Sequence, residues 1–212
     1  MSMFRLSGLA SVALAAGGCA LLVKGEVQQP RYYSPELPSA SATEPHPTLQ
    51  LRLGRISAGK AIEERMIVRE STNEVEFYED RLWTDKPVTY LRQALTRVLF
   101  EEQGLQGIYS GQGATLDVEL LAFEEVKRPK HLGRVRLAYS LRDDRLVRLQ
   151  QTLTVERPVA PASPPMEGEA VATALGIALR DAVNELTARV VHELAAAAPA
   201  SPDVPDGGPS SD

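Results

Sequence analysis

The stretch that decides the fold is GRVRLAYSLRDDRLVRLQQTLTVERPV, residues 133–159, because apolar and polar side chains alternate along both of its halves. The apolar positions are Val135, Leu137, Tyr139 and Leu141 in the first half, then Val147, Leu149, Leu153 and Val155 in the second. A period of two residues predicts strands with one buried face and one wet face. Asp143-Asp144 between the halves is typical of a tight turn. The stretch therefore predicts a β-hairpin that packs on a core.

The same alternation predicts further strands upstream of this hairpin. Leu49, Leu51 and Leu53 alternate with polar residues, and so do Leu116, Val118, Leu120 and Ala122. Between these segments, apolar residues at 66–68 and 75–77 flank Ser71-Thr72-Asn73, a pattern typical of a second hairpin.

Two segments instead have the helical period. Residues 88–103 place Leu91, Leu95, Val98 and Leu99 on one side; Pro87 suits the first turn, Thr84 or Asp85 the cap, and Gly104 the end. Residues 168–195 form a longer stripe of Leu175, Leu179, Ala182, Leu186, Val190 and Leu194.

The predicted order is βββα-βββα within a domain at residues 49–195. Two helices with one apolar stripe each can cover the same face of a single sheet. We therefore expect an α+β two-layer sandwich, with a mainly antiparallel sheet and both helices on one face. Residues 196–212 have the composition of a disordered tail.

The N-terminal segment ends at the chain's single cysteine. Residues 1–18 contain Arg5, a short apolar run and the small residues Ala16-Gly17-Gly18, directly before Cys19. This pattern is typical of a lipoprotein signal peptide, with Cys19 as the attachment point for fatty acyl chains such as palmitate. The alternative is an ordinary signal peptide that is cleaved elsewhere. A single acyl chain binds a bilayer only marginally, so stable anchoring needs several.

Residues 19–48 then read as an extended linker, because they contain five prolines and show no periodicity. We expect Tyr32 and Tyr33 within it to dock on the domain or on a partner. Trp83 has two interpretations, as a core anchor or as an aromatic residue that faces a partner.

Composition excludes several classes of function. The net charge is −5, and basic residues do not gather in one segment, which argues against nucleic-acid binding. The chain has no apolar run of the length that a transmembrane helix requires. We therefore expect a membrane link through lipid alone.

No catalytic or metal-binding motif stands out. Ser110 lacks the glycine spacing of a nucleophile elbow, and His46, His131 and His192 are dispersed along the chain. The acidic pairs, such as Glu124-Glu125, are expected on solvated faces. We therefore predict a protein that is not an enzyme and has no cofactor and no metal.

The arginines of the opening stretch have two interpretations. They are Arg134, Arg136, Arg142, Arg145 and Arg148. On the wet face of the sheet they can bind lipid phosphates or an acidic partner. Alternatively, they pair with Asp117, Glu119 and Glu125 across the strands.

Several features in one order resemble the ABC-type transport auxiliary lipoproteins, the PqiC-like family. They are the lipobox at Cys19, Tyr32-Tyr33, the block ERMIVRESTNEVEFYEDRLWTDKPVTYLRQAL, the strand LDVELLAFEEV, the residue 133–159 hairpin and an Ala-rich last helix. Two departures are Ser34 in the linker and the absence of a glycine in the last hairpin.

The resemblance implies an accessory or scaffold component of an ABC system of the MCE type. Such systems move phospholipids or other hydrophobic molecules between the inner and outer membranes. The implied partners are an MCE-domain protein, the permease and the ATPase, and the family also includes homo-oligomers. The implied location is the periplasmic side of the outer membrane, with the inner membrane as the alternative. A different function with the same architecture is an envelope-assembly lipoprotein that supports or chaperones an outer-membrane protein.

Overall fold

The computed structural model describes residues 29–36, 46, 48–110, 112–143 and 146–197, so the predicted signal peptide, Cys19 and most of the predicted tail lie outside the described residues. The strands are β1 (Arg31–Tyr33), β2 (Gln50–Ala58), β3 (Arg65–Arg69), β4 (Val75–Trp83), β5 (Gln106–Gly107), β6 (Ala114–Val126), β7 (Leu132–Arg142) and β8 (Val147–Pro158). The helices are α1 (Pro87–Thr96), which continues into a π-helix η1 (Arg97–Glu102), and α2 (Glu167–Ala197).

All eight strands belong to one sheet with β6 at its centre. On one side β6 pairs with β7 and β7 with β8, both antiparallel. On the other side the first part of β6 pairs with β2 and its end pairs with β3, both parallel, and β3 forms the predicted hairpin with β4. The α+β class and both hairpins are confirmed. The short strands β1 and β5 add to the six predicted ones.

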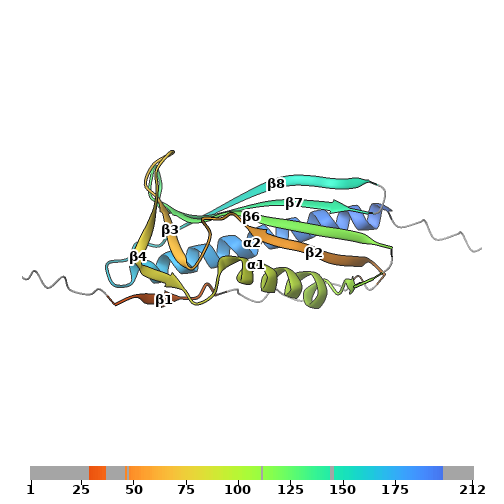
Figure 1. Cartoon of the computed structure of the whole chain (residues 1–212), viewed down its shortest axis with the longest axis horizontal. Coiled ribbons are helices and arrows are strands. Elements are labelled where there is room, and N and C mark those ends of the chain that lie inside the picture. Colours follow the sequence, from red (N-terminus) through yellow and green to blue (C-terminus); the bar gives the residue numbers. More distant parts are fainter. Residues whose placement is uncertain (1–28, 37–45, 47, 111, 144–145, 198–212) are drawn as a thin grey trace, which may run out of the picture.

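Both helices lie on the same face of the sheet, as predicted (Figure 1). α2 has 31 residues and is therefore about 45 Å long, and it runs along β6, β7 and β8. α1 packs between β2 and α2. No described helix is both long and apolar enough to span a bilayer.

The core lies between the sheet and α2. From the sheet, Leu116, Leu137 and Leu141 are fully buried, and they belong to one apolar cluster with Leu179 and Leu186 of the helix. Each such side chain contributes about 1.5–3 kcal/mol through its burial. The alternating pattern of 133–141 and the helical stripe of α2 are therefore the two surfaces that form the main core.

The start of α1 differs from the prediction. Its N-cap is Lys86, without a side-chain cap. Thr84 and Asp85 bind Tyr90 instead, because the Tyr90 hydroxyl lies 2.8 Å from Oγ1 of Thr84 and accepts the backbone N–H of Asp85 at 2.9 Å. The end is as predicted: after η1, Gly104 adopts a φ of 62°, a conformation that favours glycine.

Candidate functional site

Part of the predicted linker is built into the sheet as β1. β1 runs parallel to the end of β4, with Tyr32 beside Leu82 and Tyr33 beside Trp83. The backbone N–H of Thr84 donates to the Tyr33 carbonyl oxygen at 2.9 Å, and Arg31 donates to the Pro165 carbonyl at 3.2 Å. The backbone of this tyrosine pair is therefore docked on the domain, one of the two places expected for it.

Two glycines let this segment lie close to α2. A Cβ added to Gly168 would lie 2.4 Å from the Tyr33 hydroxyl oxygen, and one added to Gly176 would lie 2.4 Å from the Glu36 carbonyl oxygen. Real Cβ atoms do not approach other atoms so closely. Glycine at both positions thus makes room for residues 33–36 along the first turns of α2.

The three aromatic residues predicted to bind a partner differ in exposure. Trp83 is only 2% exposed and makes edge contacts with Phe123 and Tyr90, at centroid distances of 5.1 and 6.3 Å. It is a core anchor, and its side chain is not available to a partner. Tyr33 is partly buried, whereas Tyr32 is 62% exposed. Of the three, Tyr32 is the one whose ring a partner can reach.

A buried polar cluster lies on the helix side of the sheet, near the start of α2. Glu125 is fully buried; it accepts a hydrogen bond from the Tyr78 hydroxyl at 2.8 Å and bonds Nε2 of His131 at 2.6 Å. Glu167, the first residue of α2, accepts a 2.7 Å bond from Arg81. Ligand atoms of Glu125, His131 and Glu167 all lie within 4.8 Å of one another.

This spacing suits a metal, but the donors around it favour a structural role. Both carboxylates already accept hydrogen bonds from side chains of the protein. The Arg81 guanidinium also lies 4.0 Å from the centroid of the Tyr78 ring, a cation–π contact that places positive charge inside the cluster. Burial, together with the bond to Glu125, raises the pKa of Tyr78 well above its usual range. The bond from Arg81 lowers the pKa of Glu167.

The prediction that the Glu124-Glu125 pair lies on solvated faces is wrong, because both residues are buried. They do point to opposite sides of the sheet. A register irregularity between Leu120 and Ala122 changes the phase of β6, and it turns Glu125 toward the helix side. The sequence also gave no indication that His131 would join this cluster, since its partners come from distant segments.

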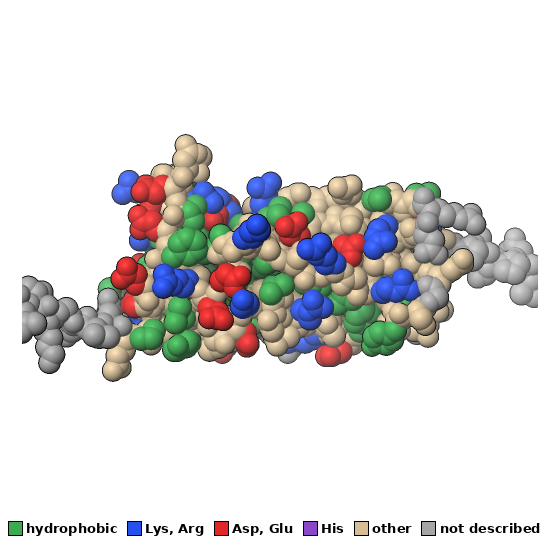
Figure 2. Space-filling view, in the orientation of Figure 1, with side chains coloured by type: hydrophobic (Ala, Val, Ile, Leu, Met, Phe, Trp, Pro, Cys, Tyr) green, Lys and Arg blue, Asp and Glu red, His purple; other side chains and the backbone are tan. Residues whose placement is uncertain are grey.

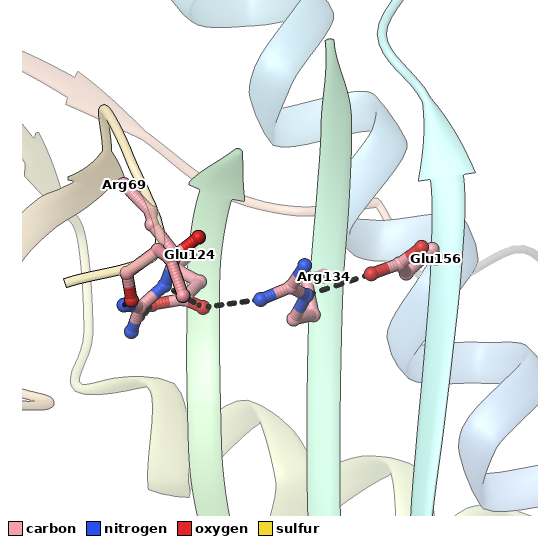
Figure 3. A network of polar contacts seen from close by, with 5 residues as sticks. Arg69, Glu124, Arg134 and Glu156 are labelled. Atoms are coloured by element: carbon pink, nitrogen blue, oxygen red, sulfur yellow. Dashed lines mark hydrogen bonds and ion pairs between the residues drawn. The ribbon is translucent and has the colours of Figure 1, made fainter. Parts of the chain in front are cut away.

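The other side of the sheet carries a ladder of ion pairs across four strands (Figure 3). Arg69 binds Glu124 at 2.9 Å, Arg134 binds Glu124 at 3.3 Å, and Arg134 also binds Glu156 at 2.7 Å. Toward the other end of β7, Arg142 binds Asp117 at 3.0 Å. Cross-strand pairing thus accounts for Arg134 and Arg142, and the buried partner of Arg134 is Glu124, not Glu125. Arg148 instead binds Asp143, directly after β7, at 2.6 Å. Arg145 lies outside the described residues.

An open groove of about 760 Å³ lies on the same side of the sheet. Its lining comes from β2, β6, β7 and β8, and includes Arg55, Ser57, Asp117, Glu119, Ala138, Ser140, Arg142, Gln150 and Thr152. Charges elsewhere are mixed as well: in Figure 2, basic and acidic side chains are interspersed over the face that the view presents.

The remaining candidates for chemistry lie apart. Ser110 is exposed in the loop between β5 and β6, and His192 lies on α2. The backbone N–H of His46 donates to the Gln103 carbonyl. The described positions of these residues therefore do not assemble a nucleophile with a base.

Comparison with known families identifies the chain. The model of the ABC-type transport auxiliary lipoprotein component matches residues 34–191, and the chain belongs to this family. The family is not a known enzyme family. Membership indicates an envelope-associated, membrane-anchored protein that works with membrane-associated partners. No curated protein matches the chain.

Solved structures share the fold. A protein from Xanthomonas campestris gives a TM-score of 0.66 at 21% identity, over 77% of this chain and 96% of its own. An uncharacterized protein gives 0.61 at 11% identity, over 76% and 99%. A hypothetical protein from Chlamydia trachomatis gives 0.50 at 12% identity, over 69% and 98%. Identities this low establish a common architecture and carry no function across.

Proposed function

We propose that this protein is a lipid-anchored, non-catalytic adaptor of an MCE-type ABC system that moves phospholipids or other hydrophobic molecules between the two membranes. Cys19 carries the lipid, and the partners are the MCE-domain protein, the permease and the ATPase. The family match over residues 34–191 is the observation that carries this proposal. We place the anchor in the outer membrane.

The position of β1 supports an adaptor role. Cys19 precedes Arg31 by twelve residues, and even a fully extended chain of that length spans only about 40 Å. Because β1 is paired with β4, this short connection would hold the β1 end of the domain near the bilayer. The end of β7 and the start of β8 lie at the opposite end (Figure 1). A domain about 45 Å long would then extend from the membrane toward its partners.

The buried cluster supports a non-catalytic role. A catalytic acid or base needs access to a substrate, and Glu125 has none because it is fully buried and already bonded to Tyr78 and His131. Beside this cluster, Lys127 directly after β6 binds Glu70 directly after β3, with 2.7 Å between the charged groups. These pairs join β3, β4, β6 and α2, so their evident effect is to hold one end of the domain together.

Co-purification from native membranes tests the proposal. A C-terminally tagged full-length chain is extracted in mild detergent, and its partners are quantified by mass spectrometry. We expect enrichment of the permease, ATPase and MCE-domain subunits of one system. Cys19→Ser serves as the matched control. This variant should be lost from the membrane fraction and should recover fewer of these subunits. Enrichment of an outer-membrane β-barrel without them would instead favour an envelope-assembly role.

Depletion of the protein gives an independent readout. If the proposal holds, depletion should change the distribution of phospholipids between the two membranes, and expression of the full chain should restore it. An unchanged distribution, with the transporter genes intact, would contradict a role in lipid transport.

A further inference from the structure

The open face of the sheet contains a trough, the open groove described above, whose lining mixes small side chains with amide and charged ones. No described helix covers this face, because α1 and α2 both pack on the other one. Register places Ser57, Glu119, Ala138 and Thr152 in one row across four strands, and Asp117, Ser140 and Gln150 in the next. Four of these residues have small side chains, and they leave room for a foreign backbone between the longer ones; they are Ser57, Ala138, Ser140 and Thr152.

Charged rows border the trough along the strand direction. On one side lies the ladder of Arg69, Glu124, Arg134 and Glu156, which Figure 3 shows in close-up. On the other side lies Arg142, which binds Asp117 of the second row. Both borders are satisfied within the protein, so they shape the trough and add little net charge to it.

Two arginines in and beside the trough differ from those of the borders, because their guanidinium groups have no partner among the described residues. Arg136 is exposed on β7, next to Ala122 on β6 and Thr154 on β8, and it makes no hydrogen bond or ion pair with any other described residue. Arg55 is exposed on β2 and lines the trough. Its backbone N–H donates to Asp117 at 2.7 Å, while its guanidinium has no partner among the described residues.

We propose that this trough docks an acidic, extended segment of a partner protein, with carboxylates that bind Arg136 and Arg55. Arginine presents a planar fork of donors that matches a carboxylate. The carboxylate of Asp117 is already bound to Arg142, so it does not compete for either arginine. The identification of the partner as a transport subunit rests on the proposed function.

The lining favours a protein over a membrane surface. Hydroxyl, amide and charged side chains dominate it, whereas a lipid would need apolar side chains next to its headgroup. Glu119 is exposed in the same trough and has no described partner. Its carboxylate can accept a hydrogen bond from a hydroxyl group that lies between two acidic residues of the docked segment. A segment that alternates acidic residues with serine has both features.

Direct binding tests the trough without a transporter. The purified full chain is titrated with a labelled peptide of alternating Glu and Ser, and separately with phosphatidylglycerol vesicles. Arg136→Glu should weaken peptide binding at least about fivefold, and added salt should weaken it in the wild type. Arg128→Glu is the matched control, because Arg128 is also exposed but lies in the loop between β6 and β7. It should bind as the wild type does. Circular dichroism and thermal melting check that both variants are folded.

The outcomes separate this inference from the proposed function. Equal peptide affinities for the two variants, or binding to the vesicles but not to the peptide, would overturn the docking site. In native membranes, recovery of the transporter subunits by the wild type and Arg128→Glu but not by Arg136→Glu would support both proposals. Recovery by all three would overturn the docking site alone. No recovery even by the wild type would contradict the proposed function, and the peptide titration would then decide the docking site.

Discussion

The Tyr33 hydroxyl lies where a side chain on Gly168 would have to be, 2.4 Å from the position of the missing Cβ. This relationship joins a segment that follows the proposed lipid anchor to the first turn of α2. A side chain at residue 168 would therefore require the Tyr33 ring to move away from the start of α2.

Gly168→Ala should therefore release β1 without unfolding the domain. Alanine is intrinsically the better helix residue, but here its Cβ would displace the Tyr33 ring. We expect severalfold faster trypsin cleavage after Arg31, measured by mass spectrometry, with the rest of the chain still protected. Tyr33→Ala combined with Gly168→Ala removes the clash, and Gly59→Ala is a control because its Cβ would meet its nearest atoms at 3.9 Å. Equal cleavage in Gly168→Ala and wild type would show that β1 is not held by this contact.

Tyr78→Phe should destabilise the domain by about 1–3 kcal/mol, because Glu125 stays buried and loses one hydrogen-bond donor. Its effect should also depend on pH. The pKa of Tyr78 is raised in the folded state, so its contribution is complete below the unfolded value of about 10 and declines as the pH rises further. Urea titrations at pH 8 and pH 11 should show a smaller difference between wild type and variant at the higher pH. Tyr109→Phe, at a residue 98% exposed, should change neither value.

Glu124→Gln should cost about 1–3 kcal/mol, since it removes the negative charge shared by Arg69 and Arg134. The carboxylate is only 6% exposed, so water cannot easily replace it as a partner. Lys86→Gln breaks the exposed pair with Glu63 and should leave the urea midpoint unchanged. If both variants unfold at the same urea concentration as the wild type, the ladder does not stabilise the sheet.

Trp83 is the chain's single tryptophan, and its fluorescence should report the core. Because the ring is buried against Phe123, emission should be blue-shifted in the folded chain and should shift red on unfolding. Binding to membranes or to partner subunits should leave it unchanged. A spectral change on binding, without unfolding, would mean that Trp83 contacts the partner after all.

The main elements of the fold could be predicted because their periodicity is local. β7 and α2 each bury a continuous face, and alternation or a helical stripe identifies such a face within the segment itself. β8 does so only in part, because Leu153 and Val155 are buried whereas Val147, expected on the same face, is 54% exposed. Shorter pieces lack this information. β1 has three residues and β5 has two, so neither shows a period, and their pairing depends on strands far along the chain.

The buried cluster could not be predicted for a different physical reason. The phase of β6 changes at the irregularity near Leu121, so simple alternation assigns Glu125 to the wrong environment. His131, Tyr78 and Glu167 then reach it from a loop, a hairpin and a helix. Parallel pairing of β2 and β3 with the same strand is also a long-range property. The arginine ladder was closer to the sequence, because alternation correctly placed Arg134 and Arg142 on the open face.

The most direct test of the anchored-adaptor account is the intact mass of the protein extracted from native membranes. The account predicts a chain that begins at Cys19, with a diacylglyceryl group on the sulfur and an acyl group on the amine. Tandem mass spectrometry of the N-terminal peptide would locate both modifications. A mature chain with a bare Cys19 thiol, or one that still carries residues 1–18, would contradict it.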